Sequence, residues 1–123
     1  MMPPIPKRLL PHSAELITKY NSDKWGSSTD QSIVQLENVR IEPTSKMAVD
    51  STGTMVKLSA ILFYDCRNSS PKETKFALKD DVISDRTVNV QQIQFDKRLF
   101  TVAVIDALYA DTSRIHHYEV GLV

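Results

Sequence analysis

The apolar residues of this chain occur in short runs, and no stretch of about 12 residues carries an apolar stripe at helical spacing. Runs of strand length lie at residues 33–41, 58–64 and 99–108, and polar turn residues separate them. Apolar and polar residues alternate at residues 87–95 and 117–123, as in a strand with one buried face. This pattern predicts an all-β fold, namely a small antiparallel β-barrel or sandwich of six to seven strands.

Two segments are less clear. Residues 13–20 are the best candidate for a helix, because Ser13 could cap one, but the β-branched Ile17 and Thr18 favour a strand. Residues 72–85 fit either a short strand or one turn of helix. Strict alternation within residues 87–95 would form two faces. One face would hold Val88, Val90 and Gln92, and the other Thr87, Asn89, Gln91, Ile93 and Phe95.

A chain of 123 residues provides for one hydrophobic core. Four of the six prolines lie among the first 13 residues, and proline fixes φ and removes a backbone donor. We therefore expect residues 1–13 to form an extended N-terminal arm and residues 14–123 to form a single β-barrel domain. The apolar residues of the arm are predicted to contact a neighbouring subunit, the alternative being a disordered terminus. They are Pro4, Ile5, Pro6, Leu9 and Leu10.

Two long loops follow from the turn residues. Residues 21–31 place the only tryptophan, Trp25, among serine, aspartate, asparagine and glycine. A tryptophan in such a loop either folds back on the core or is held out for a partner, so Trp25 is a candidate partner-binding residue. Residues 43–55 follow the second strand and carry turn formers at their middle, which predicts a long loop or a frayed hairpin.

The ionisable residues form no catalytic or metal-binding pattern. His116 and His117 are adjacent, so in a regular strand their rings would point to opposite faces. Cys66 ends an apolar strand, which favours a buried, inert thiol. Asp80 and Asp81 are not part of a calcium-binding loop, and no glycine-rich phosphate loop occurs. We expect no enzyme activity, no metal and no cofactor.

The net charge, the cysteine content and the lack of long apolar runs indicate which partners and which cellular compartment to expect. The formal net charge is +0, so the chain lacks the excess of positive charge with which a barrel binds nucleic acids non-specifically. The single cysteine cannot form an internal disulfide, so folding in a reducing cytoplasm is expected. No apolar run approaches the roughly 20 residues of a spanning helix, and the first residues lack the apolar core of a secretory signal, so no membrane association is expected.

Four stretches carry a resemblance through their order and joint presence. They are PIPKRLLPHS (residues 4–13), NVRIEP (38–43), LFYD (62–65) and HHYEVGLV (116–123). Together they resemble the minor capsid proteins of prophages and long-tailed phages of Gram-positive bacteria. FDKRLFTVAVID, at residues 95–106, is similar to that family's hairpin into the central strand. Residues 80–94 are longer than the family's compact turn, so no local strand count is carried over there.

The resemblance implies a head-completion protein, or stopper, located in the virion at the head-to-tail junction. Such proteins form a ring, generally twelvefold, beneath the portal-adaptor complex, close to the double-stranded DNA, and present a platform to the tail-completion protein. By the same resemblance, the loop after the second strand would project into the channel, the alternative being a plain exposed hairpin end. The channel residues would be Ser45, Lys46, Asp50, Ser51, Thr52, Gly53 and Thr54, with Met47, Val49 and Met55 as packing contacts.

The sequence is also compatible with other functions. A tail-terminator or tail-completion protein would come from the same virion. A single-stranded nucleic-acid-binding barrel, or a small ligand-binding or catalytic barrel that uses Cys66, His116 or His117, would belong to another class.

Overall fold

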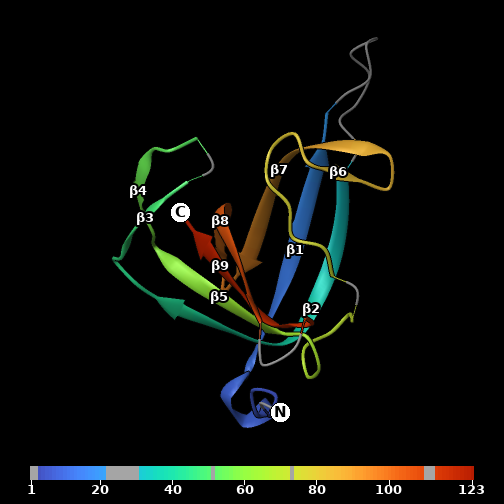
Figure 1. Ribbon diagram of the computed structural model, residues 1–123, viewed down its shortest axis with the longest axis vertical. Helices are drawn as coiled ribbons and strands as arrows, with labels where there is room; N and C mark the ends of the chain where they lie inside the picture. Colours follow the sequence, from blue (N-terminus) through green and yellow to red (C-terminus); the bar gives the residue numbers. More distant parts are fainter. Residues whose placement is uncertain (1–2, 22–30, 51, 73, 110–112) are drawn as a thin grey trace.

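The computed structural model describes residues 3–21, 31–50, 52–72, 74–109 and 113–123, and its fold is all-β, as the sequence predicts (Figure 1). One short 3-10 turn, η1 (Lys7–Leu9), precedes the strands. The strands of the described residues are β1 (His12–Tyr20), β2 (Gln31–Pro43), β3 (Met47–Val49), β4 (Met55–Lys57), β5 (Ala60–Asp65), β6 (Val82–Ile83), β7 (Arg86–Phe95), β8 (Arg98–Tyr109) and β9 (Ile115–Leu122).

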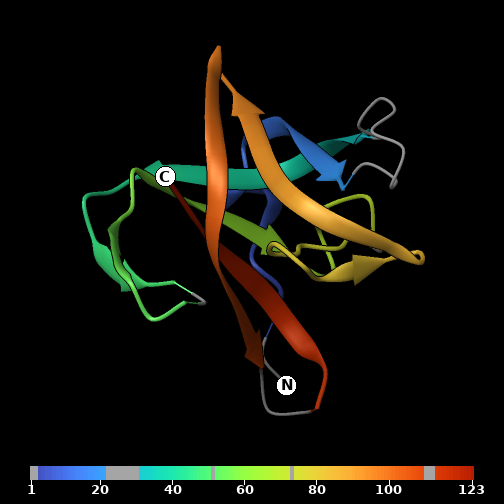
Figure 2. The same ribbon diagram turned by 90° about the horizontal axis from the view of Figure 1, so that it is seen from above.

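Six of these strands form a closed antiparallel barrel. Their order is β1-β2-β5-β9-β8-β7, and β1 pairs with β7 as well as with β2. The closing register places Leu16 opposite Ile93 and Lys19 opposite Val90. The short β6 pairs with β7 and adds a seventh strand to the sheet. The predicted barrel of six to seven strands is thereby confirmed (Figures 1 and 2).

The core fills the interior of this barrel with alternate residues of each strand. In β1 the apolar Ala14 and Leu16 are buried, and Ile17 between the buried positions is only half-buried, so residues 13–20 form a strand and not a helix. The fully buried side chains include Leu36, Val39, Leu62, Tyr64, Ile93, Val120 and Leu122. Burial of a large aliphatic side chain contributes about 1.5–3 kcal/mol, so this layer supplies most of the driving force for folding.

An irregularity in β7 overturns one detail of the predicted alternation. Val88 and Ile93 were expected on opposite faces, but both are buried, together with Gln91. Two consecutive residues of β1 pair with Val90 and Val88, so the register skips Asn89. Such a β-bulge inserts one extra residue and returns the strand to the same face of the sheet.

Two tight turns set the hairpins around β7. Ser84–Asp85 joins β6 to β7, and Asp96–Lys97 joins β7 to β8, with positive φ at all four residues. Paired positive φ values are typical of the type I′ turn, whose twist matches that of the flanking strands. The turn at residues 96–98 is as predicted. For residues 72–85 the sequence allowed a short strand or one turn of helix. The described residues of this segment contain no helical turn, and its strand is the two-residue β6.

Candidate functional site

The candidate site is a two-stranded ribbon, β3 and β4, that projects from one side of the barrel (Figure 1). Met47 lies opposite Lys57, and Val49 lies opposite Met55. These four side chains share one face of the ribbon because residues two apart in a strand point the same way. Met47, Val49 and Met55 are 49%, 54% and 57% exposed, while Ala48 and Val56 on the other face are half-buried. The sequence-predicted packing residues thus form one apolar exposed face.

The turn of the ribbon is organised by Asp50. Its Oδ1 accepts hydrogen bonds from the Thr52 backbone N–H at 2.9 Å, the Thr52 hydroxyl at 2.7 Å and the Thr54 N–H at 2.9 Å. The hydrogen bond from the Thr52 hydroxyl, followed by that from Thr54, lowers the pKa of the Asp50 carboxyl. Gly53 has a φ of +84°, which favours glycine. Ser51, also predicted for the channel loop, lies outside the described residues.

Backbone hydrogen bonds fix the base of the ribbon to the barrel. The Leu58 N–H donates to the Lys46 carbonyl at 2.9 Å, and the Thr44 N–H donates to the Ser59 carbonyl at 3.0 Å. The Ser59 N–H then donates to Leu122 of β9 at 2.7 Å. The ribbon is therefore attached at a defined orientation, and Ser45 lies exposed beside this attachment.

Gly121 provides the space for this attachment, and its replacement should be destabilising. A Cβ at position 121 would lie 2.9 Å from Leu58 Cδ1, and Leu58 is buried. We expect Gly121→Ala to lower the free energy of unfolding by about 1–2 kcal/mol and Leu58→Ala to lower it by about 2–4 kcal/mol. Because Leu58→Ala removes the clashing methyl groups, the double variant should lose about 1 kcal/mol less than the sum of the two single variants.

Urea denaturation of the four members of this cycle measures the coupling. Gly53→Ala is the control, because its positive φ makes the substitution unfavourable while nothing lies within 4 Å of the added Cβ. It should show no coupling to Leu58→Ala. Full additivity of Gly121→Ala and Leu58→Ala would contradict the proposed contact.

The N-terminal segment, residues 3–11, is tied to the barrel by Asp65. This residue is 0% exposed, and its Oδ2 accepts a hydrogen bond from the Ile5 N–H at 2.8 Å. Its Oδ1 accepts from the N–H groups of Arg67 at 2.8 Å and Asn68 at 2.9 Å. The Asn68 side-chain amide donates to the Ile5 carbonyl at 2.7 Å. Asp65, a residue that the sequence did not single out for this role, therefore positions the segment.

The predicted arm residues have different environments in this segment. Leu10 is only 1% exposed, so the chain's own residues cover it. Pro6 and Leu9 are exposed, whereas Pro4 and Ile5 are half-buried. Strand β1 already begins at His12, whose Nδ1 accepts a hydrogen bond from the Ile41 N–H at 3.0 Å. Leu9 and Pro6 therefore offer the most accessible apolar surface of the predicted arm.

The two adjacent histidines lie against each other, which corrects the expectation that their rings point to opposite faces. Their Nδ1 atoms are 2.8 Å apart, His116 Nε2 lies 2.8 Å from the Pro3 carbonyl oxygen, and His117 Nε2 lies 3.0 Å from a Glu119 oxygen. Leu108 pairs with His117 and the next residue of β8 pairs with Ile115, so His116 is an extra, bulged residue. Among the described residues, no group of three or more His, Cys, Asp or Glu side chains could hold a metal ion.

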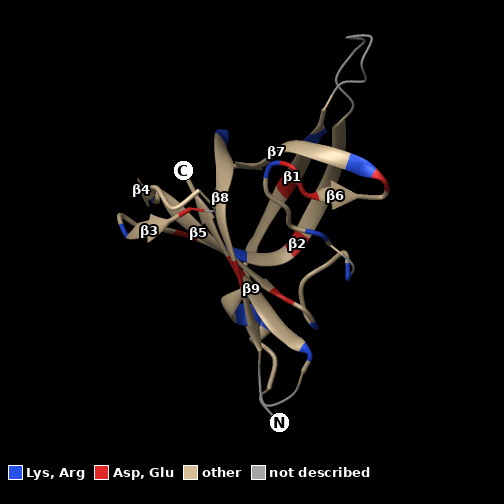
Figure 3. Ribbon diagram, turned by 45° about the horizontal axis from the view of Figure 1, so that its top comes forward, with Lys and Arg blue, Asp and Glu red and all other residues tan. Residues whose placement is uncertain are grey.

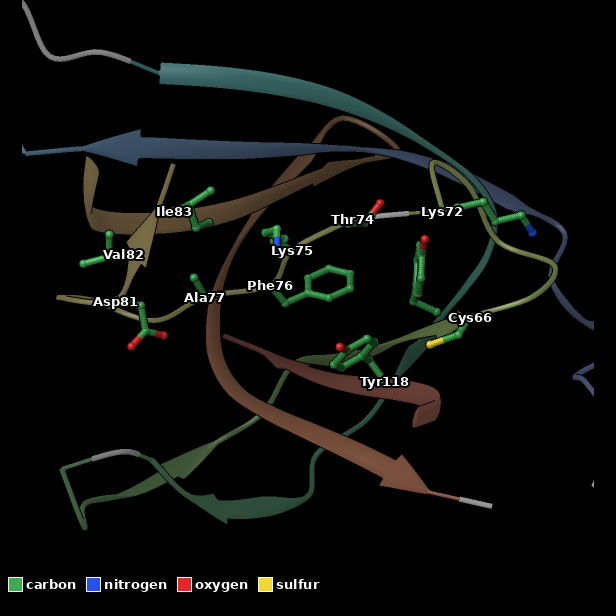
Figure 4. Close-up of a pocket in the computed structure, with 11 residues that line it drawn as sticks. Cys66, Lys72, Thr74, Lys75, Phe76, Ala77, Asp81, Val82, Ile83 and Tyr118 are labelled. Atoms are coloured by element: carbon green, nitrogen blue, oxygen red, sulfur yellow. The ribbon is translucent and has the colours of Figure 1, made fainter. Parts of the chain in front are cut away.

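A cavity of about 710 Å³ opens on the barrel (Figure 4). The segment that contributes most of its lining, residues 74–83, lies on the side of the barrel away from the ribbon (Figure 2). Three aromatic rings pack together in its lining, with Phe76 lying 5.5 Å from both Tyr64 and Tyr118 between ring centroids, and Tyr64 is buried. The buried Gln91 holds one wall, because its amide accepts from the Ala77 N–H at 2.7 Å and donates to the Lys75 carbonyl at 2.9 Å. The other lining residues are Cys66, Lys72, Thr74, Asp81, Val82 and Ile83.

The thiol of Cys66 on this cavity should react slowly. Burial raises its pKa, and the neighbouring Asp65 carboxylate raises it further. The thiolate fraction at pH 8 is therefore smaller than in a free cysteine. We expect iodoacetamide to alkylate the native protein more slowly than the urea-unfolded chain, and the native rate should continue to rise to a higher pH than the rate of the unfolded chain. Mass spectrometry measures both rates, and equal rates would contradict the burial of this thiol.

Charges of both signs are distributed over the barrel (Figure 3). Blue and red positions are interspersed along strands and turns, in keeping with the net charge of +0. None of the helices of the described residues is long and apolar enough to cross a membrane.

Trp25, predicted to bind a partner, lies outside the described residues. The structure thus brings together Met47, Val49 and Met55 on one ribbon, while the aromatic cavity was not predicted.

Comparison with known proteins gives one match. The family model described as minor capsid protein matches residues 6–122, which is nearly the whole chain. Neither a curated protein nor a solved structure matches the chain.

Proposed function

The chain belongs to the minor capsid protein family, and we propose that it is a head-completion protein of the head-to-tail junction. Copies of the chain would form a ring, generally twelvefold in such proteins, beneath the portal-adaptor complex. The ring would close the DNA-filled head and receive the tail through a tail-completion protein. The role is structural, and the chain performs no reaction in it.

The observation that carries this proposal is the exposed apolar face of the β3–β4 ribbon. Met47, Val49 and Met55 are each about half exposed on an element that stands away from the barrel. A two-stranded ribbon is only marginally stable alone, so a partner that covers this face would stabilise it. Specific interfaces bury roughly 800 Å² per partner, and a projecting ribbon supplies such area from a small domain.

The N-terminal segment supplies a second contact. Pro6 and Leu9 are exposed, and Asp65 already holds the backbone near Ile5. Because hydrogen bonds to Asp65 and Asn68 already hold the backbone at Ile5, docking loses less conformational entropy than docking of a loose arm. We propose that this segment contacts the neighbouring subunit or the portal-adaptor complex.

The turn of the ribbon fits a place at the channel. Thr52, Gly53 and Thr54 are exposed and polar, and Asp50 is the acidic residue that fixes their conformation. Residues 51–54 include no Lys or Arg, and the chain has no net positive charge to retain DNA. A turn of this kind would obstruct the channel without binding the DNA tightly.

Binding to isolated virion parts tests the proposal. DNA-filled heads that carry portal and adaptor but lack this chain are mixed with the purified protein, and tail tubes are mixed with it separately. We expect the protein to co-sediment with the heads and to protect the packaged DNA from nuclease. Co-sedimentation with tail tubes alone would instead identify a tail terminator. Binding to neither would overturn a role at this junction.

A further inference from the structure

We propose that the apolar face of the β3–β4 ribbon of one copy packs into the aromatic cavity of the next copy, an inference that rests on the ring proposed above. The occupant of the cavity is therefore a second copy of this chain. The contact pairs two different surfaces of the same chain, so it is a heterologous interface. Repetition of such an interface closes into a ring when the rotation between copies is suitable.

The positions of the two surfaces support a contact between copies. The ribbon projects from one side of the barrel, and the segment that walls the cavity lies on the opposite side (Figures 1 and 2). Hydrogen bonds of Lys46, Leu58 and Ser59 hold the ribbon base in place. These hydrogen bonds hold the ribbon on the side of the barrel away from the cavity of its own chain.

The chemistry of the two surfaces is complementary. The ribbon offers two methionines and a valine, and the cavity offers the half-buried rings of Phe76 and Tyr118, which pack on the buried Tyr64. Contacts between a thioether and an aromatic ring contribute about 0.3–1.5 kcal/mol each beyond the burial of apolar area. Methionine is also flexible enough to fill an irregular space of this kind.

The charges at the ends of the two surfaces are opposite in sign, and the cavity carries a further cation, Lys75, between its ends. Figure 4 shows Lys72 beside Cys66 at one end of the cavity and Asp81 beside Val82 at the other. On the ribbon, Asp50 begins the turn, while Lys57 lies across from Met47 near the base. If the ribbon lies along the cavity with its turn toward Lys72, its base brings Lys57 toward Asp81. Both ends then pair opposite charges.

This orientation agrees with the proposed place of the turn. Asp50 lies where β3 ends, whereas Thr52 and Gly53 lie farther along the turn. The apolar face and Asp50 can therefore pack on the neighbouring copy while Thr52 and Gly53 extend beyond it. The ring contact and the channel turn use different residues of the same ribbon.

The native cysteine of the cavity provides a direct test. Met55→Cys places a second thiol on the ribbon, and a short bismaleimide then links residue 55 of one copy to Cys66 of the next. We expect a ladder of covalent oligomers on a denaturing gel, both in concentrated protein and on heads carrying portal and adaptor. Alkylation at pH 8.5 compensates for the low reactivity of Cys66.

Two control variants make the result specific. Leu99→Cys introduces a thiol at a residue that is 53% exposed but belongs to β8 and not to the ribbon, and it should give no ladder. Met55→Cys combined with Cys66→Ser should also give none. An equal ladder from Leu99→Cys, or a ladder without Cys66, would overturn the proposed contact.

The outcomes separate this contact from the proposed function. Binding to heads without a link between residues 55 and 66 would overturn the contact and leave the head-completion role supported. A specific ladder without binding to heads would support the contact and overturn that role. Absence of both would overturn both. Mass spectrometry of the linked peptide identifies the joined residues in each case.

A charge exchange gives an independent measurement. Lys57→Glu should reduce the yield of linked oligomers by about tenfold, because it places a like charge against Asp81. Adding Asp81→Lys to the same chain should restore the yield, because the two charges are then opposite again. Failure of the double variant to exceed Lys57→Glu would contradict the proposed orientation.

Discussion

Asp65→Ala is expected to lower the free energy of unfolding by about 3 kcal/mol or more. The Asp65 carboxylate is fully buried and accepts hydrogen bonds from the N–H groups of Ile5, Arg67 and Asn68. Removing this acceptor leaves three partly buried N–H donors without the partner they have in the native state. Small domains have total stabilities of about 5–15 kcal/mol, so a large share of the stability would be lost.

The same substitution should release the N-terminal segment. Lys7 and Arg8 are exposed, and trypsin should cleave after them much faster once the bond from Ile5 to Asp65 is lost. Asp65→Asn should have an intermediate effect, because one amide oxygen can replace only one of the two carboxylate oxygens.

Asp106→Ala is a suitable control, because Asp106 is an exposed acidic residue of β8, and it should change stability by less than about 0.5 kcal/mol. Urea denaturation and time-resolved proteolysis measure the two effects. A loss of less than about 1 kcal/mol for Asp65→Ala, with unchanged trypsin cleavage, would contradict the assigned role of this carboxylate.

Met55→Asp is expected to abolish assembly while leaving the fold intact. Met55 is 57% exposed in the free subunit, so an aspartate there remains solvated and the melting temperature should stay within about 2 °C of the wild type. In the assembled state the carboxylate would enter an apolar contact, which costs several kcal/mol. A loss of about 2.7 kcal/mol already corresponds to a hundredfold weaker interface.

Complementation of a phage that lacks this chain measures the effect. We expect the yield of infectious particles with Met55→Asp to fall at least about a hundredfold. Ile33→Asp is the matched control, because Ile33 is 54% exposed but lies on β2 of the barrel, and its yield should remain near that of the wild type. A normal yield with Met55→Asp would remove the ribbon from the proposed interface.

The strands and most turns could be predicted because they follow from local sequence. Alternation and β-branched residues located β1, β2, β5, β7, β8 and β9 to within a few residues. The turn around Asp96 followed from local polarity. Turn chemistry around Asp50 indicated a long loop or a frayed hairpin, and the structure shows a hairpin in which β3 and β4 pair. These features depend on neighbours in the chain, which a sequence displays directly.

Features that depend on distant pairing could not be predicted. Closure of the barrel joins Leu16 to Ile93, and no local pattern indicates which strands will meet. The bulge that buries both Val88 and Ile93 results from that pairing, as does the contact between the two histidines. The role of Asp65 depends on residues 60 positions apart. The cavity likewise combines three separate segments of the chain.

The closure of the barrel through β1 and β7 also determines how copies of this chain can recognise one another. An open sheet leaves a row of unpaired backbone N–H and C=O groups at each edge, and further strands can be added there without a natural limit. In the barrel, each of the six strands already pairs with a neighbour on both sides. Among the described strands, open edges are left only on the short β3, β4 and β6. Contacts made by the six barrel strands must then rely on side chains, so the shape of the interface determines how many copies an assembly contains.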